Sequence, residues 1–341
     1  MRSENNLNSP GLVHSSDEYP GFKRKKHGKG FTYLDKGGQR ITDKIVLKRL
    51  KQLTIPPMWS DVWICPLPHG YLQATGKDIK GRKQYIYHDE WRMKRQQNKF
   101  EKLEDFAKEL PLIRKEVEKQ LRRKGWPRKK VIALVIGILD ETYSRIGNQH
   151  YLQANGTYGL TTLRRKHMQI DKEGIHFEYK AKSQKMRKIN ILNKRFVKLI
   201  KECSELSGYE IFRYREKPGK TTPVDSTDVN QFLQNITRED FTSKNFRTWG
   251  GTILAIKKYP EALLKKKNNP RIKLRRAIVK EVAKELGNTI AVSEKYYIHP
   301  TVLDALDENF SPENYPLNTQ PEDLETEEKL ALAIINEEEI D

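Results

Sequence analysis

The sequence predicts an α+β fold: a small sheet-containing N-terminal domain, followed by a mainly α-helical domain with a three-stranded antiparallel meander. Three observations predict this class. Short runs of alternating, β-prone residues separated by Gly and Pro occupy residues 20–95. Long segments with apolar residues at helical spacing begin near Trp91. Three short strand-like runs follow one another between residues 167 and 191.

The N-terminal domain is predicted to cover residues 21–95. Within it, residues 61–65 and 83–87 alternate polar and apolar side chains as strands do, and residues 43–53 are expected to form a short helix. The preceding residues, 1–20, are polar and rich in turn formers, so we expect them to form a flexible arm.

The second domain is predicted to cover residues 96–305, and residues 306–341 are expected to form an acidic C-terminal tail with a short helix near residues 325–339. Turn-forming residues separate the strand-like runs of the predicted meander, which indicates antiparallel hairpins. The helices of this domain are expected over residues 100–124, 131–146 and 194–298, and the meander strands over residues 167–170, 175–179 and 187–191.

Electric charge is distributed unevenly along the chain. The net charge is +20 and 32% of the residues are charged, yet residues 301–341 contain 13 acidic residues and one lysine. Residues 1–300 therefore carry a net charge of +32. Such a surplus destabilises a compact fold unless a polyanion neutralises it, which indicates nucleic acid as the partner. Charge alone fits a non-catalytic RNA-binding or ribosome-associated protein equally well.

Other features of the composition exclude several classes of protein. The longest apolar run, residues 131–139, is less than half of what a membrane-spanning helix needs, and the first residues do not resemble a signal peptide. Cys65 and Cys203 are far apart in sequence and indicate neither a zinc site nor a disulfide framework. We therefore expect a cytoplasmic protein without a membrane partner.

The sequence contains no motif for a metal ion or a nucleotide cofactor. A glycine-rich phosphate-binding loop is absent, and so is a group of aspartates suited to holding two Mg²⁺ ions. We therefore expect no cofactor. If this chain breaks phosphodiester bonds, its own cationic side chains must stabilise the charge of the transition state.

Five separated segments carry a resemblance to a known family. In content and order they resemble the catalytic segments of type IB DNA topoisomerases of the poxvirus-like and bacterial branch, within the tyrosine recombinase and topoisomerase IB superfamily. The resemblance extends over about residues 20–305, because three N-terminal segments resemble the bacterial branch. The five are Leu139–Asn148, Thr157–Leu163, the hairpin with Lys182, Lys244–Trp249 and Leu286–Pro300, and the three are Ile55–Trp59, Gln73–Asp78 and Gly81–Tyr85.

The resemblance implies an enzyme that nicks one strand of duplex DNA through a 3′-phosphotyrosyl intermediate, lets supercoils relax by strand rotation and religates without ATP or a required metal. Arg145 and Arg247 are implied to bind the non-bridging phosphate oxygens, which suits guanidinium groups because they bind bidentately and stay charged. Tyr297 is implied as the nucleophile and Lys182 as the general acid. Asn288 replaces the histidine of the poxvirus pattern, and an amide still donates one hydrogen bond to a phosphate oxygen.

Three of these assignments have an alternative, and for Arg145 it is a surface arginine at a helix end. Other basic residues surround Lys182, which also fits a hairpin that only binds phosphate. Tyr296 competes with Tyr297 for the role of nucleophile. The spacing of nine residues from Asn288 and the following Ile-His-Pro favour Tyr297, and Tyr296 is then interpreted as a core residue.

Further residues are expected to contact double-stranded DNA, and the N-terminal domain is expected to act as a DNA clamp. Gln84, Tyr85 and Tyr87 lie on one predicted strand with basic neighbours, although Tyr87 fits an ordinary half-buried strand equally well. Tyr151 and Lys244 are implied as DNA contacts by the resemblance. We expect the chain to act as a monomer associated with the nucleoid.

Two other functions remain open from the sequence. A tyrosine site-specific recombinase shares this chemistry, but recombinases usually carry a histidine three positions before the second arginine, where this chain has Lys244. They also tend to have a helical N-terminal domain. A non-catalytic basic DNA-binding protein is the second alternative, and it requires no role for Tyr297.

Overall fold

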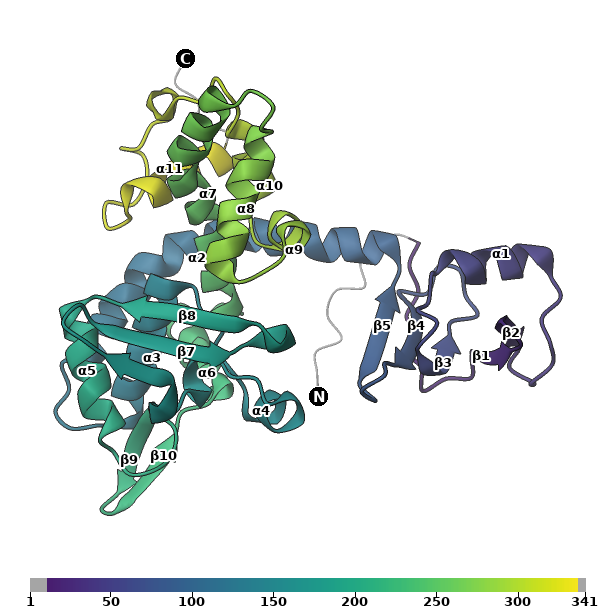
Figure 1. Ribbon diagram of the computed structural model, residues 1–341, viewed down its shortest axis with the longest axis horizontal. Helices are drawn as coiled ribbons and strands as arrows, with labels where there is room; N and C mark the ends of the chain where they lie inside the picture. The colour runs from purple at the N-terminus through teal and green to yellow at the C-terminus, as the bar shows by residue number, and fades with distance from the viewer. Residues whose placement is uncertain (1–10, 337–341) are drawn as a thin grey trace. The chain divides into compact units, whose positions relative to one another are not determined.

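The structure is a computed structural model that describes residues 11–336. The chain divides after Lys99 into two compact units, and the division falls within helix α2 (Asp89–Leu121). The predicted α+β class is confirmed, because the first unit is built on an antiparallel sheet and the second is mainly helical with a separate three-stranded sheet (Figure 1). No helix among the described residues is long and apolar enough to cross a bilayer.

The first unit is a five-stranded antiparallel sheet with the strand order β2-β1-β3-β4-β5. Helix α1 (Lys44–Gln52) begins at Asp43, whose side chain accepts hydrogen bonds from two backbone N–H groups, as a helix N-cap does. Leu50 of α1 packs with Ile64 of the sheet in the small core of this unit. The strands are β1 (Phe22–His27), β2 (Gly30–Leu34), β3 (Ser60–Ile64), β4 (Leu72–Lys77) and β5 (Lys83–Tyr87).

Residues 11–20 differ from the flexible arm that the sequence predicts. The hydroxyl of the buried Ser15 donates a hydrogen bond to the Leu72 carbonyl and accepts one from the Leu72 N–H, both at 3.0 Å. The Asp17 carboxylate accepts a hydrogen bond from the Thr75 hydroxyl at 2.8 Å. These contacts attach the segment to β4, which composition alone does not indicate. The rest of the predicted arm lies outside the described residues.

Helix α3 (Arg128–Thr142) forms the centre of the second unit. Its residues 131–139 are all buried, so this helix is enclosed on every side. Helix α5 (Lys194–Ser204) and the sheet β6-β7-β8 both pack against it (Figure 1). The predicted meander is confirmed, with strands β6 (Met168–Ile170), β7 (Ile175–Lys180) and β8 (Met186–Ile191).

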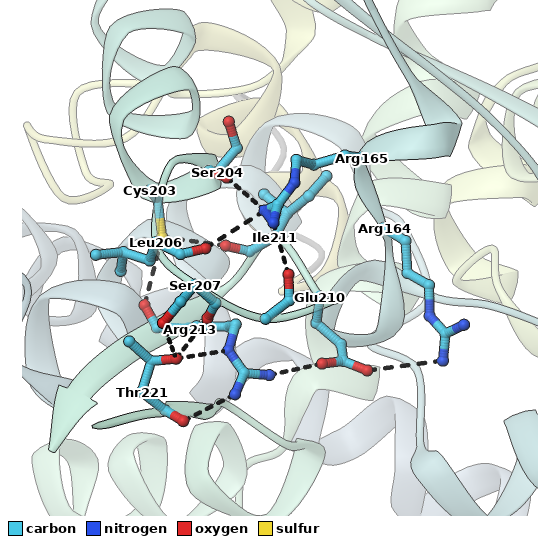
Figure 2. A network of polar contacts seen from close by, with 11 residues as sticks. Arg164, Arg165, Cys203, Ser204, Leu206, Ser207, Glu210, Ile211, Arg213 and Thr221 are labelled. Carbon is cyan, nitrogen blue, oxygen red and sulfur yellow. Dashed lines mark hydrogen bonds and ion pairs between the residues drawn. The ribbon is translucent and has the colours of Figure 1, made fainter. Parts of the chain in front are cut away.

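A second hairpin, formed by β9 (Arg213–Lys217) and β10 (Lys220–Pro223), lies where the sequence predicts only helices. That part of the prediction is wrong. Figure 2 shows how Arg213 fixes the hairpin: its guanidinium donates to the hydroxyl and the carbonyl of Thr221 and pairs with Glu210 at 2.7 Å. The strands carry mostly charged residues, so hydrophobic periodicity gives no signal for them.

The loop between α5 and β9 is held by the same polar network (Figure 2). Arg165 donates hydrogen bonds to the carbonyls of Ser204 and Gly208, both at 2.7 Å. The buried thiol of Cys203 donates to the Ile211 carbonyl at 3.3 Å. Burial raises the pKa of this thiol to about 12. Polar contacts therefore attach the loop to the second unit at several points.

The later helices of the second unit form a group around α7 (Figure 1). Helices α8, α10 and α11 all contact α7, and α9 contacts α8. Helices α7 (Ser243–Asn268), α8 (Leu274–Leu286), α9 (Ile290–Tyr296), α10 (Pro300–Ala305) and α11 (Thr326–Ile335) make up this group. The remaining helices of the unit are α4 (Gln149–Asn155) and α6 (Ser226–Thr237).

The C-terminal part of the chain differs from the predicted acidic tail. The expected short helix is present as α11, and its apolar residues are buried in the core of the second unit. Glu328 of α11 is also buried and pairs with Arg114 of α2 at 2.8 Å, and it accepts a hydrogen bond from the Trp249 indole of α7 at 3.1 Å. Arg114 pairs in addition with Asp140 of α3 at 2.7 Å. Residues 337–341 of the predicted tail lie outside the described residues.

Candidate active site

The structure brings together four of the residues that the resemblance implies, although they come from distant segments. Arg145 follows α3, Arg247 lies in the second turn of α7, Asn288 follows the end of α8, and Tyr297 directly follows α9. The Asn288 side-chain oxygen accepts hydrogen bonds from the guanidinium groups of Arg145, at 2.5 Å, and of Arg247, at 3.1 Å. The centre of the Arg247 guanidinium lies 5.2 Å from the centre of the Tyr297 ring.

The backbone at Arg145 is fixed by the segment that follows it in the resemblance. Helix α3 ends at Tyr143, which adopts a left-handed conformation with φ of 51° and turns the chain out of the helix. The Arg145 carbonyl then accepts a hydrogen bond from the Leu160 N–H at 2.8 Å, and the Ile146 carbonyl accepts one from Thr161 at 2.7 Å. The residues after Gly159 thus hold the arginine segment in place.

Arg247 is the most deeply placed cation of the site, with 4% of its surface exposed. Its guanidinium donates to the Tyr143 carbonyl at 2.7 Å and to the Leu286 carbonyl at the end of α8. Burial and, to a smaller extent, the nearby charge of Arg145 lower its pKa to about 10, although contact with Tyr297 opposes the shift. The group therefore stays charged at neutral pH.

Two adjacent glycines on α7, Gly250 and Gly251, allow Tyr143 and Tyr297 to pack directly against the helix. A Cβ atom on Gly250 would lie 2.1 Å from the Tyr143 ring, and one on Gly251 would lie 2.2 Å from the Tyr297 carbonyl oxygen. No larger residue fits at either position unless the chain moves. Sequence reasoning did not assign these residues, although a glycine pair inside a helix is a signal, since glycine weakens a helix unless packing requires it.

Tyr296, the last residue of α9, and Tyr297, which follows it, are in different environments. Tyr297 is partly buried and packs against the main core, whereas Tyr296 has 41% of its surface exposed. The interpretation of Tyr296 as a core residue is therefore wrong. The following residue Ile298 is the one that fills the core.

Two hydrogen-bond donors of the site have no acceptor among residues 11–336. They are Nε of Arg247 and Nδ2 of Asn288, and both atoms are buried. Buried polar groups in proteins are almost always hydrogen-bonded, so donors left without an acceptor indicate a place where a ligand supplies one. Next to two guanidinium groups, an anion with several oxygen atoms fits this requirement.

The structure does not bring Lys182 together with the other four residues. It begins the 3₁₀ turn Lys182–Gln184 between β7 and β8, and its side chain is exposed. Ser183 and Gln184 adopt left-handed conformations, with φ of 64° and 62°, and the Gln184 amide donates to the Asn155 carbonyl at 2.7 Å. The turn is therefore anchored to the end of α4, while the lysine points into solvent.

The residues expected to contact DNA have mostly exposed or half-buried side chains. In the first unit, Tyr85 is 48% exposed and its ring stacks 6.1 Å from Tyr87, while the Gln84 amide donates to Asp78 at 3.1 Å. In the second unit, Tyr151 of α4 is 63% exposed. Lys244 is also exposed, in the first turn of α7.

Two guanidinium groups beside a phenol are suited to bind and attack a phosphate. The net charge of +20 indicates that this phosphate belongs to a nucleic acid. The site therefore defines a class of proteins that act on the phosphodiester backbone of nucleic acid. The comparisons identify the class: the chain belongs to the type IB DNA topoisomerase family and is a DNA topoisomerase. Residues 88–324 match the catalytic core of eukaryotic DNA topoisomerase I, and residues 30–78 match the N-terminal domain of bacterial DNA topoisomerase IB. The resemblance stated from the sequence is confirmed.

Relatives among known proteins agree with this family. The chain is 31% identical over 301 residues to DNA topoisomerase 1B of Acanthamoeba polyphaga mimivirus. This alignment covers 85% of this chain and 88% of that protein. It is 26% identical over 316 residues to DNA topoisomerase 1B of Vaccinia virus, strain Western Reserve, which covers 84% and 90%. DNA topoisomerase 1 of Mycosarcoma maydis is 27% identical over 204 residues, but this covers only 20% of that larger protein. The similarity therefore spans most of the viral enzymes.

Proposed function

We propose that this topoisomerase cleaves one strand of duplex DNA by attack of the Tyr297 hydroxyl on a backbone phosphorus. The phenol loses its proton to solvent, and its oxygen forms a bond to phosphorus as the bond to the 5′-oxygen of the next nucleotide breaks. This leaves a 3′-phosphotyrosyl link and, once the 5′-oxygen is protonated, a free 5′-hydroxyl. The observation that carries the proposal is the convergence of Arg145, Arg247, Asn288 and Tyr297 from distant parts of the chain.

Arg145 and Arg247 neutralise the charge that develops on the non-bridging oxygens during attack. Their guanidinium groups share the oxygen of Asn288 in the absence of DNA, so a phosphate would take over contacts that an amide now makes. The buried Nε of Arg247 and Nδ2 of Asn288 supply two more donors. Preorganised donors of this kind typically contribute about 10²–10³-fold each to the rate.

Lys182 protonates the departing 5′-oxygen in the proposed mechanism. Its exposed position on an anchored turn supports this role, because a long, flexible ammonium group reaches a bound strand without a large backbone movement. Lys182 lies apart from the other four residues in the free enzyme. This is compatible with its role as general acid, since catalytic contacts often form only in the complex with substrate.

Religation reverses these steps after the free strand has rotated about the intact one. The tyrosyl link keeps the energy of the phosphodiester, so we propose that neither ATP nor a metal ion is required. Gln84, Tyr85, Tyr87, Tyr151 and Lys244 are proposed to contact the DNA backbone. Because one chain supplies every residue of the site, we propose a monomer, which acts in the cytoplasm on the nucleoid.

We expect the purified chain to relax negatively and positively supercoiled plasmid in the presence of a chelator and without ATP. The reason is that cations of the protein replace the metal ion, and the covalent link conserves the bond energy. Gel electrophoresis of the topoisomers measures this, and a denaturant quench should trap a nucleotide on the peptide that contains Tyr297. Activity that needs Mg²⁺, or that acts only on paired specific sites, contradicts the proposed mechanism.

Replacing Lys182 by methionine is expected to slow single-turnover cleavage by about 10²–10⁴-fold, the usual contribution of a general acid, with little change in DNA affinity. Lys185→Met is the matched control, because Lys185 is an exposed lysine that directly follows the same turn. A substrate with sulfur at the 5′-bridging position separates the roles, since a thiolate leaves without a proton. If Lys182→Met is equally slow on that substrate, Lys182 is not the general acid.

A further inference from the structure

Strand β8 carries an arginine on its core-facing side. Ile189 and Ile191 of this strand are buried, and the alternation of side chains places Arg187 on the same side of the sheet. Directly opposite on β7 is the buried Tyr179. An arginine therefore occupies a position where the pattern of the strand calls for an apolar residue.

The Arg187 side chain lies beside the end of α8, at the edge of the candidate active site. A Cβ atom on Gly287 would be 3.5 Å from Cδ and Nη1 of Arg187, and Gly287 directly precedes Asn288. Burial lowers the pKa of Arg187, and the charge of Arg145 lowers it further. The charge of Arg187 in turn contributes to the lowered pKa of Arg247. Three guanidinium groups are thus close enough to repel one another.

Two other enclosed arginines of the second unit are paired with carboxylates, whereas the half-buried Arg24 and Arg49 of the first unit donate to backbone carbonyls. Arg114 contacts Asp140 and Glu328, and Arg213 contacts Glu210. Over residues 11–336, by contrast, no ion pair joins a carboxylate to any of the three arginines of the site, and Arg187 makes no hydrogen bond. The Glu285 carboxylate opposes the lowering of the Arg187 pKa, but its ion pair is with Lys258 and not with Arg187. A partly buried charge without an ion-pair partner is costly, so the bound state of an anion is favoured at this place.

We propose that Arg187 supplies the third positive charge of the phosphate-binding site and stabilises the reacting phosphate together with Arg145 and Arg247. This inference rests on the proposed function, because it assumes that the phosphate under attack lies between those two arginines. As bonds to phosphorus change, negative charge increases on the non-bridging oxygens, and a nearby, half-buried guanidinium lowers the energy of that state more than that of the bound substrate.

The test compares Arg187→Met with Lys188→Met in single-turnover cleavage of a duplex oligonucleotide. Methionine keeps an unbranched side chain of similar length in both cases. Lys188 is the next residue on β8 and is exposed on the opposite side of the sheet. Its one ion pair within residues 11–336 is with the exposed Glu178, at 3.4 Å. We expect Arg187→Met to cleave about 10²-fold more slowly than the wild type, because loss of one group that stabilises the transition-state charge typically costs about 10²–10³-fold. Lys188→Met should cleave at the wild-type rate.

A neutral substrate distinguishes charge stabilisation from a structural role. A methylphosphonate at the cleavage position removes the negative charge of one non-bridging oxygen, so the rate loss of Arg187→Met should shrink at least tenfold relative to ordinary DNA. Arg187→Gln is measured in parallel, and thermal unfolding of each variant shows whether it is folded. Equal losses on both substrates, or a folded variant with the wild-type rate, overturn the inference.

Failure of the inference about Arg187 can be distinguished from failure of the proposed cleavage mechanism. If the wild-type chain forms no covalent adduct at Tyr297, the mechanism itself is wrong. If the wild-type chain forms the adduct and Arg187→Met cleaves ordinary DNA as fast as Lys188→Met does, only the role of Arg187 is wrong.

Discussion

Replacement of Tyr297 by phenylalanine is expected to abolish both plasmid relaxation and the covalent DNA adduct. The substitution removes a single oxygen atom, the proposed nucleophile, and leaves the ring that packs beside Arg247. Because phenylalanine has no oxygen that can bond to phosphorus, the residual rate should fall below detection, a loss of at least about 10⁴-fold as expected for removal of a nucleophile. Relaxation assays and a denaturing gel of labelled substrate measure the two activities. DNA affinity should remain close to that of the wild type.

Tyr296→Phe is the matched control for this experiment. The two tyrosines are adjacent at the end of α9, and the same atom is removed, but Tyr296 has 41% of its surface exposed. We expect this variant to relax plasmid at nearly the wild-type rate. A full loss in Tyr296→Phe with activity retained in Tyr297→Phe would transfer the role of nucleophile to Tyr296.

Replacement of Glu328 by alanine is expected to destabilise the second unit by about 3–5 kcal/mol, the usual cost of breaking a buried ion pair by removing one partner. The Glu328 side chain has only 3% of its surface exposed. Without it, Arg114 keeps one carboxylate instead of two, and the Trp249 indole loses its acceptor. Urea-induced unfolding followed by circular dichroism measures the change. Glu327→Ala is the control, because it removes a neighbouring charge that makes no ion pair within the described part of the chain.

The ion pair of Glu328 with Arg114 also makes the stability of the second unit depend on pH. Burial alone would raise the pKa of Glu328, but the hydrogen bonds and the charge of Arg114 outweigh it and lower the pKa below its ordinary value of 4.5. A lowered pKa means that this contribution is complete above about pH 4.5 and is lost as the pH falls through the folded-state value. The wild type should therefore lose more stability on acidification than Glu328→Gln does. Parallel curves for the two proteins would contradict this role of Glu328.

Local patterns predicted most of the regular structure. The helix that begins at Asp43 has a capping residue before an amphipathic segment, and the meander has alternating strands separated by turn formers. The hairpin of β9 and β10 was missed because it is held by Arg213, whose contacts with Glu210 and Thr221 depend on the tertiary fold. A strand stabilised by a guanidinium rather than by apolar packing has no period-2 signal.

The candidate site was predictable to the extent that its residues lie in distinctive segments. Arg145, Arg247, Asn288 and Tyr297 were found because each lies in a segment that resembles the family, and the structure brings them together. Arg187 was not assigned, because in a strongly basic hairpin one more arginine carries no information until its orientation is known. Charge composition likewise predicted an acidic C-terminal tail rather than a packed part of the second unit. The burial of α11 depends on its few apolar residues, which the acidic composition obscures.

Both cysteines of the chain are buried, and the loop after α5 encloses the thiol of Cys203. The reactive form of a thiol is the thiolate, and a pKa of about 12 leaves Cys203 almost entirely protonated at neutral pH. Oxidants and alkylating reagents that attack thiolates should therefore react only slowly with Cys203 in the folded protein. Labelling of Cys203 would therefore report transient opening of the loop after α5 rather than the chemistry of DNA cleavage.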